Sequence, residues 1–420
     1  MTTQQPQTNW AYEFPSHLSF TVQESVGAGR TGTLRINGSE LSTPNLFPVV
    51  SFYGGGTKSS VYGGGIHRTI KEFMIGSPAI GGDDYSEYFD GAMMSVASLT
   101  DYGINRNRFE DYIDTPIKER DTFESFNGVL FLDSGGFKFL NGQLDGSDFE
   151  MEIDQRRAFD IQQALGGDIL VNLDRPITPD DSYETRVEKA QRTAENAAEF
   201  LRLSGDYEAA RYLTVHGYNY SMIKTFFEEI VRVLGEEIVR AAFDGIALGS
   251  LVPKKDDKDE LVTAVLGCQE VLSEHGLADL PLHVLGISGS SIPLLASIGV
   301  DTFDSSSYLQ NAINGKYYQS PTNHVHIDKA DFAACDCPVC TDNELVSRMR
   351  GNTEYQKDKL GAVAMHNLIM QKRELAKIRN RLRTGDEQVM IDYIDNTVAR
   401  NDRTRRVAHR IVNETLGGYF

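Results

Sequence analysis

The sequence predicts a (β/α)8 barrel of the α/β class, and three observations favour this fold. Eight short apolar runs rich in β-branched residues recur along the 420-residue chain. Helical patterns lie between most of the runs, and a polar residue or a glycine follows nearly every one. A flavodoxin-like doubly wound sheet is the alternative, because it has the same alternation of strands and helices.

Each apolar run is expected to form one strand of a single sheet. In chain order the runs are LFPVVSFY, GAMMSVASL, GVLFLD, DILVNLD, ARYLTVHG, GIALGSL, LHVLGIS and VDTFDSSS. Residues 183–205, 221–237 and 259–276 show apolar side chains near helical spacing and end at or near a glycine, so they predict helices. The first two connections are long and glycine-rich instead.

The chain is expected to divide into four parts. These are amino-terminal strands (1–45), the barrel (46–325), a metal-binding subdomain with its helix (326–385) and a helical tail (386–420).

The composition indicates an acidic protein without a membrane segment. The formal net charge is −19, and arginine outnumbers lysine among the bases. Such a surface repels nucleic acid at long range unless salt screens it or basic residues cluster. It is typical of an ordinary acidic cytosolic protein or of a protein from a high-salt, halophilic cytoplasm. The polar start MTTQQPQTNW lacks the charged-then-apolar pattern of a signal peptide, and the expected location is the cytoplasm.

Three of the four cysteines predict a metal site. Cys335, Cys337 and Cys340 lie within six residues, and His366 follows on a helical segment. Three thiolates and one imidazole complete a tetrahedral zinc shell with no open position, so we expect a structural Zn²⁺. A reducible cysteine pair beside an unrelated histidine is the alternative. Cys268 lies in a helical apolar pattern and is expected in the core.

Acidic residues follow three of the predicted strands. Asp133, Asp174 and Asp304 end the third, fourth and eighth runs. His216 ends the fifth, Gly249 and Ser250 the sixth, and Gly286 the seventh. Each acid alone suits a turn or a helix cap, but in a barrel the strand ends meet on one face.

Such a cluster of acids suits chemistry at an anomeric carbon. One carboxylate attacks the sugar carbon and a second moves the proton, while a third accepts hydrogen bonds from a purine edge. Phe137 would stack on a planar base, unless it is simply a core or loop aromatic.

The segments FLDSGGFKF, DILVNLDRPITP, GIALGSLV, VLGIS, GVDTFDSSSYLQNAINGKYY and CDCPVC followed by HNL resemble the motifs of tRNA-guanine transglycosylases. GRTGTLRINGSELSTPNLFPVV resembles that family's opening strands, so the resemblance covers roughly residues 20–385. LDRPITPDD and FDSSSYL look closer to the archaeal branch, and to the related DNA-guanine transglycosylases, than to the bacterial branch.

This resemblance implies exchange of guanine in a polynucleotide for a 7-deazaguanine base. It implies that Asp304 is the nucleophile, Asp133 the general acid/base and Asp174 a ligand of the base. It further implies that the protein is a homodimer. The implied substrate-binding residues are Ser134, Gly135, Gly136, Phe137, Asp174, His216, Gly249, Ser250 and Gly286.

Three departures from the family pattern concern the substrate. Lys138 and His216 stand where the family usually has glutamine, and LQNAI (309–313) replaces the bacterial RNA-contacting run. The chain also shows no segment like the carboxyl-terminal tRNA-gripping module of archaeal members. These features favour DNA as the polymer, with tRNA as the alternative.

A basic helix is the candidate for phosphate contacts. Its candidate residues are Lys372, Arg373, Lys377, Arg379, Arg381 and Arg383. A solvated helix face with internal ion pairs is the alternative. Two other classes of protein remain open: a non-catalytic subunit of a split transglycosylase, and a glycosidase acting on small molecules.

Overall fold

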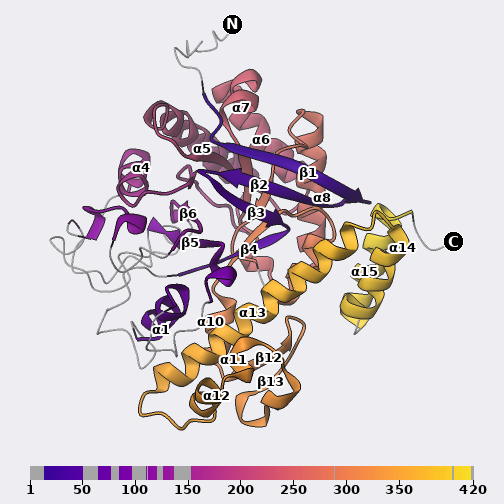
Figure 1. The fold of residues 1–420 in the computed structure, drawn as a ribbon. Helices are drawn as coiled ribbons and strands as arrows, with labels where there is room; N and C mark the ends of the chain where they lie inside the picture. Colours follow the sequence, from indigo (N-terminus) through magenta and orange to yellow (C-terminus); the bar gives the residue numbers. More distant parts are fainter. Residues whose placement is uncertain are drawn as a thin grey trace, which may run out of the picture.

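The structure is a computed structural model of the chain (Figure 1). It describes residues 14–50, 65–76, 85–96, 110, 112–120, 126–136, 153–287, 289–399 and 402–417. In these parts of the chain no helix is long and apolar enough to cross a membrane.

Eight parallel strands form the barrel, and all eight predicted runs are confirmed as strands. They are β4 (Asn45–Pro48), β5 (Gly91–Ser95), β6 (Val129–Asp133), β7 (Ile169–Val171), β8 (Ala210–His216), β9 (Gly245–Gly249), β10 (Leu282–Val284) and β11 (Thr302–Ser305). Their order in the sheet is β4-β11-β10-β9-β8-β7-β6-β5. A parallel bridge between Val49 and Met93 joins the two ends of the sheet, with the Val50 N–H donating to the Met93 carbonyl at 2.9 Å. The prediction of a barrel rather than an open doubly wound sheet is therefore confirmed.

Apolar side chains fill the interior of the barrel. Phe47, Phe131 and Tyr212 belong to one buried cluster, and the Phe131 ring lies 5.5 Å from each of the other two. A second and larger buried cluster lies between the strands and the surrounding helices. The alternation follows from the pleat, since successive residues of a strand point to opposite faces.

A three-stranded antiparallel sheet covers the amino-terminal end of the barrel (Figure 1). Its strands are β1 (Leu18–Val26), β2 (Gly29–Ile36) and β3 (Ser39–Thr43). Leu34 and Leu41 belong to the same buried cluster as Val129 and Ile169, the first residues of β6 and β7. The amino-terminal strands expected from the sequence are thus present, and they close one end of the barrel with apolar side chains.

The predicted helices after β7, β8 and β9 are confirmed. The helices around the barrel are α1 (Gly65–Met74), α4 (Gln155–Ala164), α5 (Tyr183–Leu203), α6 (Tyr220–Leu234), α7 (Glu236–Ala242), α8 (Lys258–Glu274), α9 (Ile292–Ala296) and α10 (Ser307–Ile313). Polar side chains cap four of them, because Asp154, Ser182, Asn219 and Asp257 each accept a backbone N–H of the first turn.

The chain after the barrel forms a hairpin and further helices. They are β12 (Lys316–Ser320), β13 (Asn323–His326), α11 (Pro338–Thr341), α12 (Asn343–Met349), α13 (Gln356–Leu382), α14 (Glu387–Tyr393) and α15 (Asp402–Thr415). Helix α13 runs from the hairpin and α12 to α14 and α15, and it packs against α10, α1 and β4 on the way (Figure 1).

Arg30 links the covering sheet to the barrel. Its guanidinium donates to both carboxylate oxygens of Asp301, at 3.0 and 2.6 Å, and Asp301 is fully buried directly before β11. The second oxygen of Asp301 also accepts the Leu282 N–H at 2.8 Å, which places the start of β10.

We predict that Arg30→Ala lowers the free energy of unfolding by about 3 kcal/mol or more, because it leaves a buried carboxylate without its cation. Arg35→Ala on the same strand is the control. Its pair with Glu40 is more than half exposed on both sides and is worth at most about 1 kcal/mol. Urea unfolding measures both variants, and equal losses would contradict the prediction.

Candidate active site

Three carboxylates meet at the carboxyl ends of the barrel strands. Asp133 is the last residue of β6, Asp174 follows β7, and Asp304 lies in β11. The pKa of Asp133 is raised to about 7, first by burial and then by the negative charges of Asp174 and Asp304. The three acids expected to form a site therefore lie close enough to influence one another electrostatically.

Asp133 is held by two donors that only partly offset this shift. The Gly135 N–H donates to its Oδ2 at 3.1 Å, and the Ser95 hydroxyl also donates; both bonds act to lower the pKa. A carboxyl group with a pKa near 7 both gives and takes a proton at neutral pH, which is the requirement for a general acid/base.

Asp304 is bound through one of its two oxygens. Its Oδ1 accepts the Gly286 N–H at 2.6 Å and lies 3.3 Å from Nε2 of His283. Gly286 adopts a φ of +71°, a left-handed conformation that favours glycine, and this aims its N–H at the carboxylate. Sequence reasoning included Gly286 but missed His283, whose only signal was one polar residue inside an apolar run.

Asp174 lies against His216, the residue that replaces the family's usual glutamine. Nε2 of His216 is 3.0 Å from Asp174 Oδ2, although its N–H is not aligned for a good hydrogen bond with any described residue. Nδ1 lies 3.0 Å from the Ser250 hydroxyl, whose oxygen accepts the Ile177 N–H. Ser250 has a φ of +67°, a strained conformation that this pair of contacts supports.

Ser134 and Gly136 bring the β6 loop onto Asp174. The Ser134 hydroxyl donates to Asp174 Oδ1 at 3.3 Å. A Cβ atom on Gly136 would lie 2.0 Å from that same oxygen, so only glycine permits this approach. Gly249 similarly packs against the His216 ring. Phe137 and Lys138 lie outside the described residues.

A cleft of about 680 Å³ opens beside Asp304. It extends from Gly286 and Asp304 across the start of α10 to the β12–β13 hairpin. Two lysines, Lys255 and Lys316, and His324 line it, together with the neutral side chains of Gln310 and Asn311 and with two acids, Asp256 and Asp304. The net charge of the molecule is −19, whereas in the lining of this cleft the two lysines balance the two aspartates. Burial and the charge of Lys316 lower the pKa of His324, which favours its neutral form.

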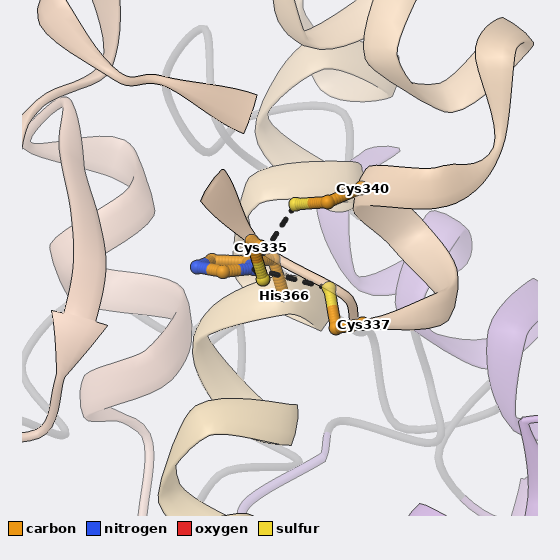
Figure 2. A group of neighbouring side chains, drawn as sticks. All are labelled: Cys335, Cys337, Cys340 and His366. Atoms are coloured by element: carbon orange, nitrogen blue, oxygen red, sulfur yellow. Dashed lines mark hydrogen bonds between the residues drawn. The ribbon is translucent and has the colours of Figure 1, made fainter. Parts of the chain in front are cut away.

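Cys335, Cys337, Cys340 and His366 form a candidate metal centre (Figure 2). The three sulfur atoms lie 3.9, 3.3 and 3.4 Å from Nδ1 of His366. A tetrahedral ion with bonds of about 2.3 Å to sulfur and about 2.0 Å to nitrogen separates these ligand atoms by about 3.6 Å. The four residues predicted from the sequence thus come together in a geometry that fits one metal ion.

The surroundings orient the histidine towards the sulfurs. Nε2 of His366 donates to the Tyr318 carbonyl at 2.7 Å, so Nδ1 keeps its lone pair for the metal. The Tyr317 ring stacks on the imidazole at 3.9 Å, and its hydroxyl lies 3.2 Å from the Cys340 sulfur. Such support is typical of a closed structural site. Cys268 is buried in α8, as expected.

The basic residues of α13 do not form one surface. Lys372 is 8% exposed, and its ammonium donates to Asn45 and Asp90. Arg379 donates to the Pro44 carbonyl, so both residues attach the helix to the barrel. The other four are at least partly exposed, and their role in phosphate binding stays a prediction; they are Arg373, Lys377, Arg381 and Arg383.

The protein is thus a (β/α)8 barrel with three interacting carboxylates at one end and a candidate Cys3His metal centre. The family model described as queuine tRNA-ribosyltransferase matches residues 100–398. The chain therefore belongs to this family, the tRNA-guanine transglycosylases, as the sequence motifs suggested.

The similar curated proteins include archaeal members of the family. The tRNA-guanine(15) transglycosylase of Pyrococcus abyssi is 26% identical over 380 residues, which cover 89% of this chain and 56% of the relative. The protein of the same name from Methanopyrus kandleri is 25% identical over 378 residues, covering 88% and 70%. The chain thus spans little more than half the length of the first of these relatives.

The raised pKa of Asp133 predicts a pH-dependent stability. A carboxyl group whose pKa is higher in the folded protein stabilises the fold below its unfolded pKa of 3.8, and this contribution is lost as the pH rises through about 7. An asparagine side chain cannot ionise, so the free energy of unfolding of Asp133→Asn, compared with that of the native protein, should rise as the pH increases from 4 to 8. The expected rise is on the order of 1–3 kcal/mol. Unfolding in urea across this range measures the difference. Ser95→Ala removes a donor that lowers the pKa of Asp133, so it should enlarge this pH-dependent difference. A difference in stability that does not change with pH would contradict the raised pKa of Asp133.

The metal centre predicts one tightly bound metal ion per chain, with zinc expected from the donor set. Cys337→Ser should lose the metal and several kcal/mol of stability, because a hydroxyl is a poor zinc ligand. Metal analysis and thermal unfolding check this, with Cys268→Ala as the cysteine control that keeps its metal. Full metal content in Cys337→Ser would refute the site.

Proposed function

We propose that this protein exchanges a guanine base in a polynucleotide for a 7-deazaguanine base through a covalent bond to Asp304. The observation that carries the proposal is the meeting of Asp133, Asp174 and Asp304 at one end of the barrel, with the pKa of Asp133 raised to about 7. Membership of the family supports it, as do the names of the archaeal relatives.

The residues divide the chemistry between them. A carboxylate oxygen of Asp304 attacks C1′ of the sugar as the bond to N9 of guanine breaks, and protonated Asp133 donates a proton to the departing base. Asp133 then removes a proton from the incoming base, whose ring nitrogen attacks C1′ and releases Asp304. A carboxyl group that switches between acid and base in this way needs a pKa near the working pH.

Asp174 is proposed to bind the base. An ionised carboxylate accepts the N–H groups of a guanine-like edge, and His216 with Ser250 would orient it. Ser134, Gly135 and Gly136 would shape the pocket wall, with Gly249 behind His216. A stacking role for Phe137 remains a prediction from the sequence.

Two polymers are candidates for the substrate. The sequence favours DNA, because LQNAI replaces the bacterial RNA-contacting run. This segment forms part of α10 beside the cleft. tRNA is the second candidate, carried by the printed names of the relatives. In either polymer the target nucleotide has to leave its stack to reach Asp304, and duplex DNA requires base flipping.

The Cys3His centre is proposed to hold Zn²⁺ in a structural role. Bound zinc would fix the α11 segment against α13, because the four residues come from that segment and from α13 itself. The hairpin is joined to this centre through the hydrogen bond from His366 to the Tyr318 carbonyl of β12. The homodimer expected from the family resemblance also remains a proposal. The presence of Asp304 with its donors opposes the alternative of a non-catalytic subunit.

Exchange of radiolabelled guanine into tRNA and into DNA tests the proposal. We expect incorporation into one polymer, and a loss of at least about 1,000-fold in Asp304→Asn because the covalent step requires an ionised carboxylate. Asp206→Asn, an exposed acid after α5, should exchange at the native rate. Absence of exchange into both polymers by the native protein would overturn the proposed function.

A further inference from the structure

His283 lies inside the barrel directly beneath Asp304. It is fully buried in β10, where it pairs in register with Thr302 of β11. Its ring stacks on Phe131 with 4.5 Å between centroids and an angle of 30° between the planes, and Phe47 lies 6.1 Å away. The imidazole is therefore held in one orientation by aromatic neighbours.

The two ring nitrogens of His283 face two different partners. Nδ1 lies 2.9 Å from the Thr302 hydroxyl, and Nε2 lies 3.3 Å from Asp304 Oδ1. An ionised carboxylate only accepts hydrogen bonds, so Nε2 must carry the proton in this contact. In the neutral ring Nδ1 is then an acceptor, and the Thr302 hydroxyl donates to it.

We propose that His283 is a positioning residue for Asp304, oriented by Thr302, and that it selects Oδ2 as the attacking oxygen. Oδ1 receives both the His283 and the Gly286 donors, whereas Oδ2 has no hydrogen bond from any residue in the described part of the chain. The unbound oxygen keeps its lone pairs for C1′. This inference rests on the proposed function, because it assigns a role within that covalent mechanism.

The two donors act mainly on the second half of the exchange. In the first half the C1′–Oδ2 bond forms, the C1′–N9 bond breaks, and its electron pair leaves with guanine, which takes the Asp133 proton. Oδ1 becomes the carbonyl oxygen of the ester. In the second half the incoming base, deprotonated by Asp133, bonds to C1′, and the C1′–Oδ2 electron pair returns to the carboxylate. Donors to Oδ1 stabilise this returning charge and so favour release of Asp304.

Half-reaction kinetics test the proposal. Enzyme and labelled polymer are mixed without added base, and the covalent complex is measured after denaturation; guanine is then added to chase it. We expect His283→Leu to slow the chase at least tenfold more than it slows formation, so that the covalent complex accumulates. His283→Gln, which restores a donor, should return the chase to within about threefold of the native rate.

Thr302→Val is the matched variant that leaves His283 in place. It replaces the hydroxyl by a methyl group of similar size, removes the donor to Nδ1 and should slow the chase by about two- to fivefold without changing KM for the polymer. Its small change in shape keeps the test valid even if His283→Leu does not fold. If the ratio of the formation rate to the chase rate in Thr302→Val, or in folded His283→Leu, equals the ratio of the native protein, this inference alone is overturned. A native enzyme that exchanges neither polymer would overturn the proposed function as well.

Discussion

Closure of the eight-stranded sheet is the constraint on which the site depends. The bridge between Val49 and Met93 joins β4 to β5, and β11 pairs with β4 on the other side. In a closed barrel all carboxyl ends of the strands face one region, whereas in an open sheet β5 and β11 would lie far apart. Closure therefore brings Asp304 to the same place as Asp133 and Asp174, although β6 and β11 are distant in the chain.

The two ends of the barrel use aspartate for opposite purposes. At the amino-terminal end Asp168, Asp244 and Asp301 each lie directly before a strand, and each accepts a backbone N–H at the start of the neighbouring strand. Lys118 and Arg30 balance two of these charges. The acids at the carboxyl end have no such cations among the partners recorded in the described part of the chain. Their mutual repulsion helps to raise the pKa of Asp133, so the same residue type gives stability at one end and reactivity at the other.

Helix α13 connects the metal centre to the barrel. His366 lies on one stretch of it as the fourth residue of the candidate metal centre, and Lys372 lies further along with its ammonium buried against Asn45 and Asp90. Asn367 between them accepts the Tyr318 N–H and donates to the Tyr308 carbonyl. The cleft beside Asp304 is lined by α10 and by the hairpin β12–β13, both of which pack on this helix. A metal ion bound by these four residues would thus stabilise the wall of the cleft.

The sequence by itself determined the eight strands, the three aspartates at or after their ends and the four residues of the candidate metal centre. These depend on local patterns: apolar runs, residues at strand ends and short cysteine spacing. Only the tertiary structure decided the contacts between distant strands. It placed His283 beneath Asp304 and His216 against Asp174, and neither arrangement has a local signal, since each depends on the register between strands. It also showed that Lys372 is buried, although its basic neighbours resembled an exposed stripe. Sequence spacing indicates which residues share a helix, but burial depends on what packs against that helix.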